Sequence, residues 1–468
     1  MMKENKNSPI WAGKSSDGGA TDSERYLAKL ARRAFLNFWS YSNPYTDEGG
    51  GKELCDFMVV FGSDIIIFSD KHCKFPKHDD IKIAWYRWYR SAIEKSAKQL
   101  AGAASFVERF PERIYLDSDC KRPLPIPLPP SDSRKIHLIA VTRGSADAAK
   151  IFWKNNSSSS LLINTTLTGS NHKDHPFTVG RPLNNGRFVH VLDEMTLDIL
   201  LNELDTVSDF VGYLTKKEEY LSTSNPDFII CGEEELLASY FMHPLPDLKG
   251  FSFPLIPSTE KIIFFDEGIW KQFYQSKAYS AWKKKNEVSY EWDRLIEHQT
   301  SHIRRDTAAV LFKRGGDLQD INAHESVLRA MAEEGRVARR IIAENHKSLL
   351  ERDLSNSSEN RLARTLVLPH KNKRVYVLLV LTQAPGLDYE EYREARRESL
   401  IGFCRAARLR VAEIDEIIGI ASEQSSSPIL TQDFMYMKFD KILSQQEKEE
   451  EIAFLRAEGI WKEHWISV

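Results

Sequence analysis

Hydrophobic and polar residues alternate with a period that changes along the chain, and each change predicts a new element. Apolar residues recur at helical spacing over about 22–40, which predicts an amphipathic helix. Two short β-branched runs follow at 55–61 and 64–70, and the Gly-Ser pair between them is typical of a hairpin. A long helix is predicted over 81–110 and a buried strand over 136–144. The expected order is therefore helix, strand, strand, helix, strand.

The rest of the chain is predicted to be largely helical, with a small α/β domain at its end. Amphipathic or charge-rich helical patterns cover 194–221 and 267–352. After a Ser- and Asn-rich linker, strand, helix and strand patterns occupy 374–382, 389–410 and 416–423. We therefore expect an α/β protein with a mixed sheet and these parts: a flexible N-terminus at 1–20, an α/β core at 21–150, an extension of that core with a helical region at 151–265, a helical region at 266–360, and a small α/β C-terminal domain at 361–468.

Composition places the chain among ordinary globular proteins and limits its partners. Hydrophobic residues make up 42% and charged residues 28%, which argues against a disordered chain. The formal net charge of −3 means that any contact with nucleic acid must come from a local basic patch. The cysteines are scattered without a CxxC pair, which argues against a disulfide framework and favours a cytoplasmic location. No apolar run reaches the roughly 18 residues of a membrane span, so no membrane partner is expected.

The ends of the predicted hairpin carry charged residues whose spacing suggests chemistry. Asp56 stands at the head of the first strand and Lys71 at the end of the second. Side chains alternate along a strand, so Ser69 and Lys71 share one face and Asp70 takes the other. Hydrolysis of a phosphodiester on a metal needs carboxylate oxygens for Mg²⁺ and a cation beside the attacking water. Asp56, Ser69 and Lys71 are therefore candidate catalytic residues, although solvated strand ends would also explain the charges.

These features resemble the PD-(D/E)XK, or restriction-endonuclease-like, nuclease superfamily over residues 20–145. Its members carry an acid at the start of one strand, a tight hairpin, and a second strand ending in acid-x-Lys, often with a Glu in the preceding helix. Asp56 matches the first acid, Lys71 the lysine and Glu24 the helical glutamate. The resemblance implies a restriction-endonuclease-like N-terminal core that hydrolyses nucleic acid with Mg²⁺ or Mn²⁺. It also implies that Asp56 holds the metal, that Lys71 orients the attacking water, and that Glu24 supports the metal through water.

One position departs from this pattern, because Ser69 stands where the acid of acid-x-Lys is expected. Some members of the superfamily use Ser here and recruit the acid from the following helix or nearby. Glu53, Asp70 and Glu94 are the candidates to complete the metal shell beside Asp56. If none of them reaches the metal, the site would bind nucleic acid without cutting it.

The predicted helix over 81–110 interleaves aromatic and basic residues, a combination that suits a phosphate backbone and exposed bases. Trp85 and Trp88 are expected in the core, while the charged side chains either contact nucleic acid or are merely solvated. The candidate nucleic-acid-binding residues are Arg87, Arg90, Lys95, Lys98 and Gln99.

The function expected from these patterns is that of a Mg²⁺-dependent deoxyribonuclease, an endonuclease acting on DNA more readily than on RNA. Bacterial restriction or anti-phage defence is a common setting for such fusions, by analogy of fold. The helical and C-terminal regions would select substrate, form a homo-oligomer or dock a partner protein. The alternative is a catalytically inactive nuclease fold that binds nucleic acid or serves as a scaffold for protein interaction, and Ser69 is the residue that favours it.

Overall fold

The computed structural model describes residues 21–154, 158–184, 186–223, 226–246, 250–256, 259–304, 321–352, 361–368, 373–383, 386–411, 413–424, 431–439 and 443–461. The chain divides into two compact units, and the division falls after Lys284, within helix α9 (Lys277–Asn286). Both units combine helices with mixed sheets, so the predicted α/β class is confirmed. Among the described residues, no helix is long and apolar enough to cross a membrane.

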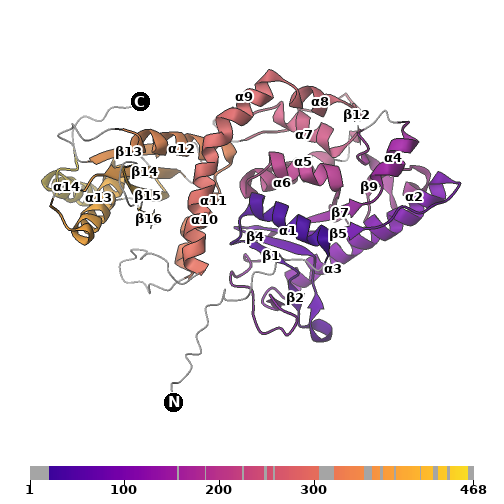
Figure 1. The fold of residues 1–468 in the computed structure, drawn as a ribbon, viewed down its shortest axis with the longest axis horizontal. Helices are drawn as coiled ribbons and strands as arrows, with labels where there is room; N and C mark the ends of the chain where they lie inside the picture. The colour runs from indigo at the N-terminus through magenta and orange to yellow at the C-terminus, as the bar shows by residue number, and fades with distance from the viewer. Residues whose placement is uncertain are drawn as a thin grey trace, which may run out of the picture. The chain divides into compact units, whose positions relative to one another are not determined.

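The first unit is organised around a five-stranded sheet in the order β1-β4-β5-β7-β10 (Figure 1). Strands β1, β4 and β5 are antiparallel, whereas β5, β7 and β10 run parallel. The sheet strands are β1 (Ser40–Ser42), β4 (Phe57–Phe61), β5 (Asp64–His72), β7 (Lys135–Arg143) and β10 (His190–Asp193). The hairpin predicted at Gly62-Ser63 is β4–β5, and the predicted buried strand is β7. The short strand β1 was not predicted.

Helices cover both faces of this sheet (Figure 1). Phe35 of α1 (Asp22–Phe35) packs against Phe68 of β5 and Phe210 of α6 (Val207–Leu221) on one face. On the other face, Ile67 and its apolar neighbours pack against α3 (Lys95–Arg109). The helix predicted over 22–40 ends earlier, because Leu36 adopts a φ of 64° that no α-helix continues.

The long helix predicted over 81–110 is present, but it is not uniform. It consists of α2 (Ile81–Tyr89), a π-helical turn η2 (Arg90–Glu94) and α3. Asp80 caps its start by accepting a hydrogen bond from the backbone N–H of Lys82. A π-turn inserts one extra residue and therefore shifts the helix face by about 100° between α2 and α3.

Smaller elements complete the first unit. A four-stranded sheet has the order β12-β11-β8-β9, and a three-stranded one the order β3-β2-β6. Their strands are β8 (Leu162–Thr168), β9 (Thr178–Arg181), β11 (Asp227–Ile230), β12 (Ile262–Phe265), β2 (Tyr45–Thr46), β3 (Lys52–Glu53) and β6 (Ile114–Tyr115). The remaining helices are α4 (Ala146–Phe152), η3 (Gly169–Asp174), α5 (Glu194–Glu203), α7 (Glu233–Phe241) and α8 (Ile269–Tyr274).

The second unit contains the predicted strand–helix–strand arrangement. Strands β14 (Arg374–Leu381) and β15 (Glu416–Glu423) are parallel and connected through α13 (Tyr389–Arg410). Antiparallel strands β13 (Arg361–Val367) and β16 (Gln432–Lys438) flank them. The other helices are η5 (Glu287–Ser289), α10 (Tyr290–Arg304), α11 (Ile321–Ala332), α12 (Arg336–Leu350) and α14 (Gln445–Ala457).

A mostly buried histidine in this unit predicts a dependence of stability on pH. His346 of α12 lies 3.0 Å from the Ser422 hydroxyl, measured from Nε2 to Oγ, and burial lowers its pKa to about 4. In the unfolded chain His346 is protonated near pH 6.5, whereas in the folded chain it is protonated only near pH 4. The folded state is therefore fully stable with respect to this group above pH 6.5, and its free energy of unfolding falls as pH falls between these two values. We expect the free energy of unfolding to fall by up to about 1.4 kcal/mol per pH unit between pH 6.5 and pH 4.

Urea unfolding at pH 7 and pH 5 measures this effect. The difference between the two midpoints should be smaller in His346→Gln, whose amide keeps a hydrogen-bonding group near Ser422. Equal pH dependence in the parent and the variant would assign the effect to other groups.

Candidate active site

Asp56 lies at the point where the β4–β5 hairpin ends and β5 continues alone. Its backbone N–H donates to the Phe68 carbonyl at 3.2 Å, and its carbonyl accepts from the Asn43 N–H at 3.1 Å. Its carboxylate oxygen Oδ2 accepts a hydrogen bond from the backbone N–H of Asp70 at 2.5 Å. Rigid backbone thus holds the carboxylate beside the overhanging end of β5, as a site built on strands requires.

The residues of this overhang point alternately to the two sides of the sheet. Ile65 and Ile67 of β5 pack in the core beneath α3, and alternation places Ser69 and Lys71 on their side. Ser69 is buried at 5% exposure, and Lys71 is half-buried.

Asp70 faces the opposite side, where it forms an ion pair with Arg143 at the end of β7. Arg143 Nε lies 3.1 Å from Asp70 Oδ1, and the Asp70 side chain has 0% exposure. This pairing occupies the carboxylate, so the structure does not bring Asp70 to the Asp56–Lys71 face as a metal ligand. Arg143 was not predicted as part of the site.

The electrostatics of Asp56 show which charges surround it. Burial raises the pKa of Asp56 to about 6, against the Asp70 N–H and the Lys71 ammonium, which lower it. The carboxylates of Glu53 and Glu24 raise it further. Glu24 and Glu53 also raise the pKa of Tyr45, after the larger effect of burial. The charges of Lys71, Glu53 and Glu24 therefore all reach the Asp56 carboxylate, and the charge of Glu24 also raises the pKa of Asp70.

The two glutamates reach this group from separate elements. Glu53 ends β3, is exposed, and accepts a hydrogen bond from the Asn43 amide at 2.5 Å. Glu24 lies in the first turn of α1, where its Oε2 accepts from the Thr21 N–H at 3.3 Å and its own N–H donates to Thr21 Oγ1 at 3.2 Å. This reciprocal pair caps α1 and fixes Glu24 at the helix start.

Glu94 turns away from the group. Its carboxylate lies 2.5 Å from Lys98 Nζ and 3.8 Å from Arg90 Nε. It lines a separate hollow of about 500 Å³ together with Tyr86, Tyr89 and Asn184. The described residues around that hollow do not include Asp56 or Lys71, so the structure does not bring Glu94 to the predicted metal shell.

The helix pair α2–α3 presents its basic side chains to solvent and its tryptophans to the core. The indole N–H of Trp85 donates to the His172 carbonyl at 2.7 Å, and that of Trp88 donates to the Cys73 carbonyl at 2.8 Å. Both tryptophans are buried, as predicted. The residues predicted to bind nucleic acid are all exposed: Arg87, Arg90, Lys95, Lys98 and Gln99.

Lys95 connects this exposed surface with the candidate site. Burial raises the pKa of the Cys73 thiol, and the charges of Lys71 and Lys95 both lower it. The charges of both lysines therefore reach the Cys73 thiol. Arg90 and Lys98, in contrast, are turned toward Glu94.

Known family models, curated proteins and solved structures were compared with this chain, and none matches it. The functional assignment therefore depends on the geometry of the site. Two carboxylates, a third at a helix start and a lysine can together hold an oxygen-liganded cation and stabilise negative charge beside it.

Proposed function

We propose that this protein is a divalent-metal-dependent nuclease that hydrolyses phosphodiester bonds in DNA. One observation carries the proposal: the charges of Lys71, Glu53 and Glu24 all act on the Asp56 carboxylate at one end of the sheet. The arrangement around them also agrees with the nuclease resemblance, because one helix and three antiparallel strands are followed by a helix and a parallel strand. A role in bacterial restriction or anti-phage defence belongs to the same proposal and rests on analogy of fold.

The donor set fits Mg²⁺ or Mn²⁺. Asp56 and Glu53 offer carboxylate oxygens, the ligands that these ions take in proteins, and Glu24 would contribute through water. The raised pKa of Asp56 supports this fit. Burial and the nearby glutamates disfavour the charged carboxylate, and the positive charge of Lys71 does not compensate for them, so a bound cation would stabilise it. When bound, the ion would polarise the phosphate and acidify a water molecule.

Each residue of the chain has a separate task in this proposal. Asp56, held by backbone hydrogen bonds, fixes the ion at the end of the sheet. Lys71 orients the attacking water and stabilises the charge that develops on the phosphate. The exposed basic residues of α2–α3 contact the phosphate backbone on either side.

Glu53 is the carboxylate that we assign in place of the motif acid absent at Ser69. The variant Glu53→Gln is expected to slow cleavage by at least about tenfold and to raise the Mg²⁺ concentration needed for half-maximal rate, because a metal ligand is lost. Glu94→Gln is the matched control, since Glu94 lines the separate hollow, and it should cleave like the parent. The rate of cleavage is measured as a function of Mg²⁺ concentration. If Glu94→Gln is slowed and Glu53→Gln is not, then Glu94 and not Glu53 is the metal ligand.

The proposal is tested by incubating the purified chain with supercoiled plasmid, linear duplex, single-stranded DNA and single-stranded RNA. Reactions contain Mg²⁺ or Mn²⁺, with a chelator as the control. We expect metal-dependent nicking or linearisation of the plasmid, which only endonucleolytic cleavage produces, and weaker cleavage of RNA.

The alternative is a nuclease fold that binds nucleic acid or a partner protein without cutting. The observation that favours it is Ser69, which is buried in the place of the motif acid. Binding of DNA without cleavage of any substrate, with either ion, would support this alternative and contradict the proposal.

A further inference from the structure

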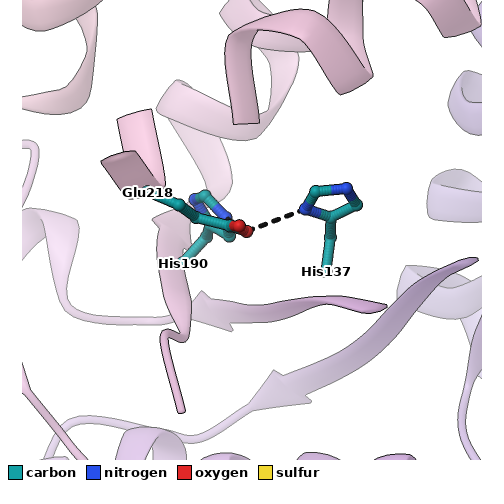
Figure 2. A group of neighbouring side chains, drawn as sticks. All are labelled: His137, His190 and Glu218. Atoms are coloured by element: carbon teal, nitrogen blue, oxygen red, sulfur yellow. Dashed lines mark hydrogen bonds and ion pairs between the residues drawn. The ribbon is translucent and has the colours of Figure 1, made fainter. Parts of the chain in front are cut away.

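A second group of titratable side chains lies toward the opposite end of the central sheet. It consists of His137 on β7, His190 on β10 and Glu218 on α6 (Figure 2). His137 pairs with Ile66 of β5, whereas Lys71 pairs with Thr142, five residues farther along β7. At about 3.3 Å per residue, His137 lies about 16 Å along β7 from Thr142, whereas His190 pairs with Ile139, about 10 Å from Thr142.

The three side chains converge on one carboxylate oxygen. Glu218 Oε1 lies 2.8 Å from His137 Nδ1 and 2.8 Å from His190 Nε2. The far nitrogen of His137, Nε2, lies 3.2 Å from Asp64 Oδ1. All three potential ligand atoms lie within 4.8 Å of one another, and they come from two strands and one helix.

The two histidines of this group are buried, and their pKa values are shifted in opposite directions. Burial alone would lower the pKa of His137, but hydrogen bonds to Asp64 and Glu218 raise it to about 9. Burial lowers the pKa of His190 to about 4, against the hydrogen bond to Glu218. Both ring nitrogens that face Glu218 are hydrogen-bonded to it, so an ion that binds them must displace the protons of these bonds. The histidine side chains have 2% and 0% exposure, whereas Glu218 retains 26%, which gives an ion a route from solvent.

We propose that His137, His190 and Glu218 form a binding site for a divalent transition-metal ion, with Zn²⁺ as the preferred class. Two imidazole nitrogens and one carboxylate are a donor set for zinc, with bonds of about 2.0–2.2 Å. Tetrahedral ligands at that bond length are about 3.3 Å apart. The two N–O distances of 2.8 Å must therefore open by about half an ångström, and the two ring nitrogens, which lie within 4.8 Å of each other, must come to about the same separation.

The surroundings support a metal rather than a purely hydrogen-bonded group. Metal-ligating histidines usually donate their other ring N–H to a carboxylate, which fixes the ring, and Asp64 has this position relative to His137. Three protein ligands leave a fourth position for water on the exposed side of Glu218. Nitrogen donors also separate this site from the oxygen-rich Asp56 group, because imidazole favours zinc and carboxylates favour magnesium.

The bound ion would join α6 to strands β7 and β10. Because the unfolded chain does not hold these ligands together, binding should stabilise the folded unit by an amount that rises with the logarithm of the ion concentration. Zn²⁺ is therefore expected to raise the midpoint of thermal unfolding of the chelator-treated protein.

The experiment is a titration of the chelator-treated full chain with Zn²⁺ in a buffer containing excess Mg²⁺. Calorimetry and elemental analysis after gel filtration should give one Zn²⁺ per chain. Replacing Zn²⁺ with Co²⁺ should give visible d–d absorption without a thiolate charge-transfer band, which excludes the cysteines as ligands. No stoichiometric Zn²⁺, or a thiolate band, would overturn the proposal.

Variants separate this site from the rest of the molecule. His137→Gln and Glu218→Gln should lose the bound Zn²⁺, and Asp64→Asn should weaken it by about 10–100-fold. The exposed His175→Gln and the active-site Asp56→Asn should bind Zn²⁺ like the parent. Parental affinity in a folded Glu218→Gln chain would overturn the proposal. If the two ligand variants do not fold, unchanged affinity in Asp64→Asn would do so.

Discussion

Replacing Lys71 with alanine is expected to lower the rate of Mg²⁺-dependent DNA cleavage by about 10²–10⁴-fold while leaving the chain folded. Lys71 lies on the overhanging end of β5, is half-buried, and lowers the pKa of Asp56 by its charge. Its removal takes away both the group that orients water and the positive charge beside the phosphate. Little packing is lost, because β5 has already passed the end of β4 at this position.

Lys74→Ala is the matched control for this variant. Lys74 is an exposed lysine three residues farther along the same segment, so its loss changes the net charge equally. Initial rates on supercoiled plasmid, with circular dichroism of each protein, separate the loss of chemistry from the loss of fold. A Lys71→Ala protein that cleaves as fast as the parent would remove Lys71 from the mechanism.

Arg374→Met is expected to destabilise the second unit by about 3–5 kcal/mol, the usual cost of leaving buried charges without their partner. Arg374 opens β14 with 1% of its side chain exposed. Its guanidinium lies 2.6 Å from Glu416, 3.0 Å from Glu334 and 2.6 Å from Glu333. Methionine fills similar space but leaves these carboxylates facing an apolar side chain.

Hydrogen exchange of peptides from β14 and β15 measures this effect within the second unit alone. Exchange through unfolding should become faster by about 10²–10⁴-fold, which corresponds to the expected loss of stability. Lys373→Ala is the control, because the adjacent Lys373–Glu413 pair is exposed and contributes little. Equal exchange in Arg374→Met and Lys373→Ala would show that the buried network is not a major source of stability.

The elements that the sequence predicts are those with a strong pattern of their own. The β4–β5 hairpin and the β14–α13–β15 arrangement are apolar or amphipathic over their whole length, and the structure contains both. Strand β1 has three residues and exists because it pairs with β4. The half-buried strand β13 likewise depends on its neighbour, so its weak pattern gives little signal.

Some features of the candidate site follow from the local sequence, and others depend on the tertiary structure. Alternation along β5 is enough to separate Asp70 from Ser69 and Lys71. The ion pair between Asp70 and Arg143 depends on the parallel register of β5 and β7, which no local sequence pattern determines. Glu94 was expected near the metal, but the side of α3 that meets the sheet end depends on the π-turn and on packing.

The group of His137, His190 and Glu218 could not be found from sequence for the same reason. Each histidine lies in a short strand next to apolar residues, and Glu218 is one of several acids on an amphipathic helix. Only the parallel pairing of β7 with β10 and the packing of α6 bring them together.

The proposal that Asp56 holds the catalytic metal ion of a nuclease is tested by comparing the parent chain with Asp56→Asn in paired assays of DNA cleavage and DNA binding. The exposed Asp132→Asn serves as the control for the loss of one negative charge. We expect that the parent and Asp132→Asn cleave plasmid DNA in Mg²⁺, whereas Asp56→Asn binds DNA with similar affinity and does not cut it. Undiminished cleavage by Asp56→Asn, or no cleavage by the parent with either Mg²⁺ or Mn²⁺, would contradict it.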